Sequence, residues 1–247
     1  MHPPREVAPF VGTFTTAAQA WDAIQSERAR EVPVRLWRRA ALCGIDNLAR
    51  EVRARARLGD VLDHVAGRAA MFEDDEDDED VSIWAAAEEI APGVLPLIPV
   101  PRELPGPHVS QIWIGGRGQR TTLHEDAFPN YNFQLHGRKR FIVFSPTEAV
   151  HLDRCPVRAG EFRADPGGAG VVGHPALAQT RPRIFTLEPG QFIHIPAWWP
   201  HQVIYLSPLA ANINHWGMSQ SRDFDSTGHA KEETHPHQGD RQEPHPR

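Results

Sequence analysis

The sequence predicts a mainly-β fold, a double-stranded β-helix (jelly roll), with helices in front of it. Between residues 109 and 217, eight short segments are rich in β-branched or aromatic residues, and Gly, Pro, Asn or Asp bounds each of them. Before residue 107, apolar residues recur instead at helical spacing. Eight short strands in one stretch favour two facing sheets, as in a jelly roll.

The first hundred residues are predicted to be mostly helical. Thr16 is a candidate N-cap for a helix with Ala17, Trp21 and Ile24 on one side. Further expected elements are a short edge strand at 33–37, a helix through Leu48 and Val52 that ends near Leu58, and a helix over 83–90 capped by Ser82. Residues 92–107 hold too many prolines for a helix or a central strand, so we expect an extended connector there.

A long insertion divides the eight predicted strands into two groups of four. Gly137 predicts a tight hairpin between the third and fourth strands. The insertion covers residues 146–180, and its loop-like core belongs to a class of long loops that are usually functional or disordered. The predicted strands are VSQIWIGG, QRTTLHED, NYNFQLHG, KRFIVFSP, RIFTLEPG, QFIHIPAW, HQVIYLSP and AANINHWG.

These patterns predict three regions along the chain. Residues 1–107 form a helical N-terminal extension and connector. Residues 108–218 form the β-helix core, interrupted by the insertion. Residues 219–247 are polar and poor in apolar side chains, so we expect a flexible tail.

The composition favours a cytoplasmic protein without a membrane segment. The 247 residues can bury a substantial core, and one domain with extensions fits that length. Cys43 and Cys155 are too few for a disulfide framework and are not spaced as a metal site. The N-terminus MHPPREVAPF lacks an apolar h-region, and no stretch approaches the ~20 apolar residues of a membrane span.

The net charge of −6 hides an uneven distribution. Residues 73–80 read EDDEDDED, and the segment before them is rich in arginine. Such an acidic run is typical of a solvated, mobile loop; it could also attract a basic substrate or lie over the chain's own arginines. The arginine-rich segment raises the possibility of nucleic-acid binding, but it lacks interleaved aromatic residues, which makes that partner the weaker expectation.

His124, Asp126 and His201 form the strongest candidate site. Positions i and i+2 of a strand point to the same side, so His124 and Asp126 can share one metal ion while Glu125 points away. His201 begins another predicted strand and can supply the third ligand. Two imidazoles with one carboxylate are the facial triad of non-haem iron(II), whereas a closed structural zinc site has more protein donors.

Lys139 is the next candidate, because it lies in a predicted strand among apolar residues. A lysine that faces the interior of a β-helix is costly unless an anion pairs with it, and a dicarboxylate co-substrate could be that anion. Thr121 could donate a hydrogen bond to the same carboxylate. From spacing alone, a solvent-facing Lys139 at a strand start is an equally good interpretation.

The stretch WIGGRGQRTTLHEDAFPNYNFQLHGRKRFIVFSP resembles the metal-binding core of JmjC-type, cupin-like oxygenases that use iron(II) and 2-oxoglutarate. LEPGQFIHIPAWWPHQV is similar to a second motif of that family, and the resemblance extends from about Ile90 to Met218. The hydroxylase subgroup, which includes the asparaginyl hydroxylase of hypoxia-inducible factor, is the most similar. The chain departs from the family at Glu125, where Tyr or Phe is usual, and Gln191 replaces an Asp.

The resemblance implies a role for each matching residue. His124, Asp126 and His201 match the iron ligands. Lys139 and Thr121 match the residues that hold the distal carboxylate of 2-oxoglutarate. The residues implied to line the co-substrate pocket are Asn130, Asn214 and Trp216.

The expected function is therefore an iron(II)- and 2-oxoglutarate-dependent oxygenase that consumes O2. It would hydroxylate a peptide or protein side chain, or a small amino-acid-like substrate, while 2-oxoglutarate is converted to succinate. The alternatives are a non-oxygenase metal-binding cupin (an isomerase or a sensor), a tRNA-modifying oxygenase, and a partner-binding module with a decayed site. The sequence does not define the substrate or the oligomeric state.

Overall fold

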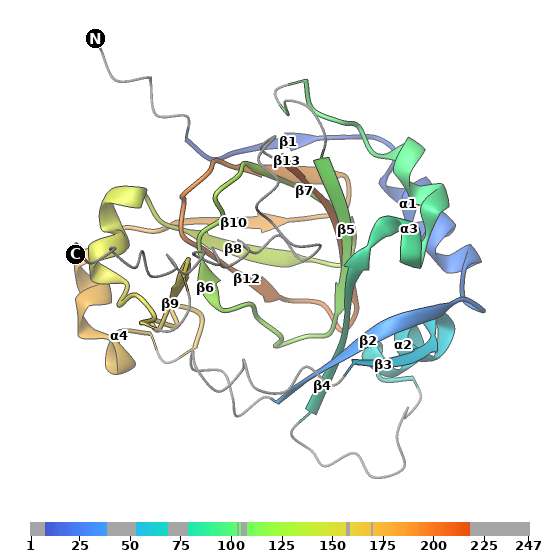
Figure 1. Ribbon diagram of the computed structural model, residues 1–247, viewed down its shortest axis with the longest axis horizontal. Helices are drawn as coiled ribbons and strands as arrows, with labels where there is room; N and C mark the ends of the chain where they lie inside the picture. Colours follow the sequence, from blue (N-terminus) through green and yellow to red (C-terminus); the bar gives the residue numbers. More distant parts are fainter. Residues whose placement is uncertain are drawn as a thin grey trace, which may run out of the picture.

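The computed structural model describes residues 8–38, 53–68, 79–102, 104, 108–156, 159–168 and 170–217, which form two facing β-sheets (Figure 1). The larger sheet has eight strands in the order β1-β11-β7-β13-β5-β4-β2-β3. The smaller sheet has five strands in the order β10-β8-β12-β6-β9. The predicted class, a mainly-β double-stranded β-helix with N-terminal helices, is confirmed.

All eight predicted core strands are present. In the larger sheet they are β5 (His108–Gly115), β7 (Asn130–His136), β11 (Gln191–Ile195) and β13 (Ala210–Gly217). In the smaller sheet they are β6 (Leu123–His124), β8 (Lys139–Val143), β10 (Arg183–Leu187) and β12 (His201–Tyr205). A further strand, β1 (Phe10–Thr13), pairs with β11 at the edge of the larger sheet and was not predicted.

The larger sheet has an apolar outer face and a mixed inner face. Along β13, Ala211 and Ile213 join an outer apolar cluster that also contains Phe133 of β7 and Ile24 in the N-terminal region. Successive side chains of a strand alternate in direction, so Asn212, between these two, points to the inner side. The hydrophobic effect of the outer cluster therefore fixes which side chains face the smaller sheet.

Part of the space between the sheets is apolar. Ile193 and Ile195 of β11 form a cluster with Phe141 of β8 and Val203 of β12, which come from the smaller sheet. This cluster closes one part of the interior. It also identifies the inner face of each strand, because residues that pair across neighbouring strands share a face.

Within the described part of the N-terminal region, three α-helices precede the core: α1 (Ala17–Ser26), α2 (Leu58–Val65) and α3 (Ala87–Ile90). The helix α1 begins directly after Thr16, as the sequence predicts, and buries Ala20 and Ile24. Thr16 does not cap it through its side chain, because its hydroxyl donates a hydrogen bond to the carbonyl of Leu97. This hydrogen bond links the start of α1 to the proline-rich connector.

Two helix predictions in this region are wrong. Where a helix was expected to run up to Leu58, Arg53–Arg57 form strand β3, and α2 begins only at Leu58. The first half of residues 83–90 belongs to strand β4 (Glu79–Ala86), and only the second half is helical. In both segments, pairing with a neighbouring strand outweighs the helical pattern. The Arg-Ala alternation of β3 pairs with β2 (Glu31–Arg38), and β4 pairs with β5. The expected edge strand at 33–37 is β2, which lies between β3 and β4 instead.

The proline-rich connector is not extended throughout. Pro92–Leu97 form a 3-10 helix with buried Val94. Pro92 occupies its first position, where the missing backbone N–H costs no hydrogen bond. The prolines therefore excluded an α-helix but not this shorter one.

Gly137 makes a turn, but the predicted hairpin is wrong. The strands before and after it, β7 and β8, belong to different sheets, so the turn carries the chain from the larger sheet to the smaller one. Gly137 has a φ of 62°, and a Cβ at this position would overlap the carbonyl oxygen of Leu209. Both the conformation and the close approach of the backbone require glycine.

Replacing Gly137 by alanine should lower the free energy of unfolding by about 2–4 kcal/mol, because strain in the left-handed region adds to a steric overlap. Gly118→Ala is the matched control, since Gly118 has a φ of 90° and open space where a Cβ would lie. The control should cost about 1 kcal/mol. Denaturant unfolding of both variants measures the difference, and equal losses would contradict the steric part.

The insertion is more ordered than its sequence indicates. It contains 3-10 helices at Pro146–His151 and Pro175–Gln179, the strand β9 (Glu161–Phe162) and the helix α4 (Gly170–Gly173). Leu152, Phe162 and Leu177 pack against Leu123 and Phe144 of the core. The insertion therefore covers the side of the smaller sheet at β6 and β9 (Figure 1).

Some predictions fall on residues outside this description. They concern Leu48 and Val52 of the expected helix, most of the acidic run (73–78) and the tail (219–247). Among the described residues, no helix is both long and apolar enough to cross a membrane.

Candidate metal centre

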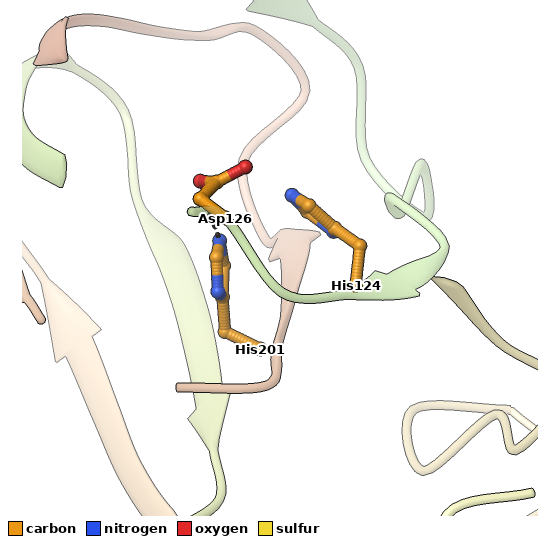
Figure 2. Close-up of side chains that lie close together, drawn as sticks. All are labelled: His124, Asp126 and His201. Carbon is orange, nitrogen blue, oxygen red and sulfur yellow. Dashed lines mark ion pairs between the residues drawn. The ribbon is translucent and has the colours of Figure 1, made fainter. Parts of the chain in front are cut away.

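The structure brings His124, Asp126 and His201 together at the start of β12. The register pairs His201 directly with His124 of β6, and Asp126 follows two residues later. One ligand atom from each residue lies within 4.8 Å of the other two. The Nε2 atom of His201 is 3.8 Å from Oδ2 of Asp126, and Figure 2 shows the three side chains converging.

Both imidazoles are oriented by backbone carbonyls. Nδ1 of His124 lies 2.9 Å from the carbonyl oxygen of Thr122, and Nδ1 of His201 lies 2.9 Å from that of Trp199. A carbonyl oxygen only accepts, so each Nδ1 carries the hydrogen and each Nε2 presents a lone pair. This tautomer, fixed by a carbonyl behind the ring, is the arrangement of histidines that bind metals in proteins.

The electrostatics of the three residues suit a divalent cation. His201 is 2% exposed, and its pKa is lowered to about 4, first by burial and then by the neighbouring His124. His201 is therefore a neutral ligand at neutral pH. Oδ2 of Asp126 is buried and has no hydrogen-bond partner, which is costly for a carboxylate unless a cation compensates it. The donor set fits iron(II), because two imidazoles and one carboxylate leave coordination positions open.

A polar strip runs along the inner faces of β7 and β13. Asn130 and Asn132 lie opposite Ile195 and Ile193, which face the smaller sheet, and Asn132 pairs with Asn214 on the other side. Several buried polar atoms of this strip have no hydrogen-bond partner: Asn130 Oδ1, Asn132 Oδ1, Gln134 Oε1, Asn212 Nδ2 and Trp216 Nε1. Buried polar groups are almost always satisfied, so a ligand or water is expected to complete them.

The structure thus places the predicted Asn130, Asn214 and Trp216 on one inner face. Asn214 is buried and accepts a hydrogen bond of 3.0 Å from Nε1 of Trp113. The sequence prediction missed the inward carboxamides Asn132, Gln134 and Asn212. Their signal was the period of two, because each stands an even number of positions from a predicted residue on the same strand.

Lys139 faces the interior and is 1% exposed, whereas the next residue, Arg140, is exposed. The solvent-facing interpretation is therefore wrong. Its Nζ lies 3.7 Å from the ring centroid of Tyr205, donates to Oδ1 of Asn212 and is 3.4 Å from the carbonyl oxygen of Trp113. Burial lowers its pKa well below the ordinary value. None of the ion pairs found among the described residues involves it.

Thr121 lies beside strand β12. Its N–H donates to the carbonyl of Val203, and its Oγ1 accepts a 3.0 Å hydrogen bond from the N–H of Val203. Val203 belongs to the inner apolar cluster, and it stands between His201 and Tyr205 on the inward face of β12. Thr121 therefore lies along the path from the metal ligands to Lys139.

Glu125 connects the metal-binding strand to the insertion. Its N–H donates to the carbonyl of Gly160, and its carboxylate accepts hydrogen bonds of 2.7 and 3.3 Å from Arg154. The guanidinium of Arg154 also lies 4.8 Å above the ring of Phe162. The carboxylate of Glu125 thus anchors the insertion.

A second contact links the insertion to β12. Gln202, next to His201, donates a 2.8 Å hydrogen bond to Asp165 and accepts one of 2.7 Å from the N–H of Gly167. Asp165 also forms an ion pair of 3.0 Å with Arg120. The insertion therefore holds both strands that carry metal ligands.

Trp198 is held in a strained conformation beside the site. Its φ is 64°, in the left-handed region that bulky residues rarely adopt. Its N–H donates a 2.7 Å hydrogen bond to the backbone carbonyl of Asp126, and its side chain is 54% exposed. The turn thus stabilises the position of a metal ligand at the expense of backbone strain.

The strain at Trp198 can be measured by comparing two substitutions. Trp198→Gly should be more stable than Trp198→Ala by about 1 kcal/mol, because both lack the ring and only alanine has a Cβ that opposes a left-handed φ. Val150, which is exposed in a 3-10 helix and has no positive φ, is the control position. There Val150→Ala should be more stable than Val150→Gly. Denaturant unfolding gives both differences, and the same order at both positions would rule out the strain.

Comparison with known proteins agrees with the fold. Residues 47–222 match the model of the family described as Cupin-like domain. The chain, a double-stranded β-helix with a two-histidine, one-carboxylate cluster, belongs to this family.

Several curated proteins are similar to part of the chain. HSPB1-associated protein 1 of Rattus norvegicus is 32% identical over 112 residues, covering 43% of this chain and 23% of that protein. "2-oxoglutarate and iron-dependent oxygenase JMJD4" of Gallus gallus is 28% identical over 42% of this chain and 25% of its own length. tRNA wybutosine-synthesizing protein 5 of Homo sapiens is 30% identical over 46% of this chain and 36% of its own length. The match thus spans only about a quarter to a third of these relatives.

Among solved structures, the X-ray structure of E. coli ycfD superposes with a TM-score of 0.48 at 18% sequence identity. The superposition covers 87% of this chain and 50% of that one.

Proposed function

We propose that this chain is an iron(II)- and 2-oxoglutarate-dependent oxygenase. The observation that carries the proposal is the buried ammonium of Lys139, which has no acidic partner among the described residues and shares an interior with the metal-ligand cluster. A buried amine is costly to protonate without a counter-charge, so an anion bound beside Lys139 would stabilise its charged form. A cluster that binds a metal beside a site that binds an anion fits a dicarboxylate that chelates the metal.

In this proposal each residue has a defined task. His124, Asp126 and His201 would hold iron(II) through two neutral Nε2 atoms and one carboxylate. Lys139 and the hydroxyl of Thr121 would bind the distal carboxylate of 2-oxoglutarate. Asn130, Asn214 and Trp216 would line the co-substrate, and the unpaired polar atoms of Asn130 and Trp216 are consistent with that role.

The bound iron would supply the activation of O2, coupled to decarboxylation of 2-oxoglutarate to succinate and hydroxylation of a substrate. The chain itself would orient the reactants and exclude water. The apolar cluster of Phe141, Ile193 and Val203 beside the site supports the exclusion of water. The structure supports a non-oxygenase cupin less well, because such a protein needs no anchor for a dicarboxylate.

The proposed substrate is a peptide or protein side chain, or a small amino-acid-like molecule. The resemblance to the hydroxylase subgroup supports this choice, and the relative JMJD4 of Gallus gallus is an oxygenase of the 2-oxoglutarate- and iron-dependent class.

A tRNA substrate is the second candidate. Two relatives are tRNA wybutosine-synthesizing proteins, and the edge strand β3 of this chain presents the exposed Arg55 and Arg57. Arginines on an exposed edge can contact phosphates. Binding of bulk tRNA that weakens steeply with salt, and that is lost in Arg55→Ser/Arg57→Ser, would favour this candidate.

An anaerobic titration tests the proposal. Adding iron(II) and then 2-oxoglutarate to the wild-type protein should produce a visible charge-transfer band, which is the signature of 2-oxoglutarate chelating the metal. His201→Ala should show no band, because one of three protein ligands is missing. Lys139→Met should bind iron normally but need roughly 10- to 100-fold more 2-oxoglutarate, since a hydrogen-bonded charge pair contributes about 1.5–3 kcal/mol.

His151→Ala is the matched control, because His151 lies in the 3-10 helix of the insertion and outside the metal-ligand cluster. It should reproduce the wild-type band. A wild-type protein that binds iron(II) but gives no band with 2-oxoglutarate would contradict the proposed function. An unchanged band in His201→Ala would contradict the ligand assignment.

A further inference from the structure

The buried ammonium of Lys139 is held by a neutral amide. Its Nζ donates a hydrogen bond to Oδ1 of Asn212, and both residues are almost fully buried. Lys139 comes from β8 of the smaller sheet and Asn212 from β13 of the larger one, so this contact bridges the interior. The contact positions the charge but leaves it uncompensated, because a carboxamide is an acceptor without a formal charge.

The surroundings leave the ammonium free to bind a further group. An ammonium has three N–H donors, and the contact to the carbonyl of Trp113 is long at 3.4 Å. The ring of Tyr205 offers a π-face but no negative charge. On the amide, Nδ2 of Asn212 is buried without a partner. The protein thus leaves unpaired donors on both sides of this contact.

We propose that Asn212 is a positioning residue that sets the affinity for the dicarboxylate co-substrate, an inference that rests on the proposed function. Its carbonyl oxygen fixes Lys139 in place, and its neutrality preserves the positive charge for the distal carboxylate of the co-substrate. A residue with a purely structural task would do better as an acid, because aspartate at this position would pair with the buried charge. The pairing of Asn212 with Gln134 of β7 and Trp113 of β5 holds its side chain on the inward face of β13.

Three substitutions at Asn212 separate positioning from structure. Asn212→Asp places a carboxylate beside Lys139, so the metal-free protein should melt at a higher temperature while 2-oxoglutarate affinity falls by ~100-fold or more. Asn212→Leu removes the acceptor at similar volume and should weaken 2-oxoglutarate binding ~10-fold. Asn212→Thr keeps a neutral oxygen and strand propensity, so its affinity should stay within ~3-fold of wild type.

The measurements are the melting temperature without ligand, the affinity for Mn(II) as an air-stable substitute for iron(II), and the 2-oxoglutarate-dependent rise in melting temperature with Mn(II) present. Mn(II) affinity should be unchanged in all three variants, because Asn212 is not among the metal-ligand residues. A higher melting temperature combined with lost 2-oxoglutarate binding in Asn212→Asp supports the inference. If Asn212 had only a structural role, its substitution would change stability and 2-oxoglutarate affinity in the same direction.

Wild-type affinity for 2-oxoglutarate in Asn212→Asp would overturn the inference and leave the proposed function intact. If Asn212→Asp does not fold, Asn212→Leu decides the matter, because unchanged 2-oxoglutarate affinity in that variant also overturns it. A wild-type protein that binds Mn(II) without any response to 2-oxoglutarate would refute the proposed function itself, and the inference with it.

Discussion

The pairing of His201 with His124 across β12 and β6 is the constraint on which the candidate site depends. A strand that slipped by one residue would turn its whole row of side chains to the opposite face. His201 would then leave the interior, and the exchanged Gln202 could not replace it as a ligand. The register is held by apolar side chains on both faces of the smaller sheet, among them Phe141 inside and Ile142 outside. Hydrophobic packing therefore determines where the imidazoles lie.

Between the sheets, the interior is divided into an apolar part and a polar part. The apolar part consists of aliphatic and aromatic side chains from both sheets. The polar part contains carboxamides on two neighbouring strands and one ammonium. In a medium of low polarity each unpaired group raises the free energy of the protein and also increases its attraction for a complementary ligand. The same residues thus limit stability and favour binding.

The strands and the convergence of His124, Asp126 and His201 could be predicted from the sequence because their signals are local. Alternation and turn residues identified all eight core strands, and the two-residue spacing brought His124 and Asp126 to one side. The errors arose where non-local pairing decided the structure. Arg53–Arg57 became a strand through β2, and the turn at Gly137 joined two sheets rather than two paired strands. The contact between Lys139 and Asn212 could not be predicted, because it joins residues seventy-three positions apart in different sheets.

The attachment of the insertion to both ligand-bearing strands has a consequence for how the protein can vary. Glu125 and Gln202 each stand next to a metal ligand, yet their side chains are engaged by Arg154 and Asp165 of the insertion. Sequence changes in the insertion can therefore alter the geometry of the candidate ligand atoms while the ligands themselves stay the same. Adaptation of the centre to a new task could then proceed through residues 146–180, at some distance from the chemistry.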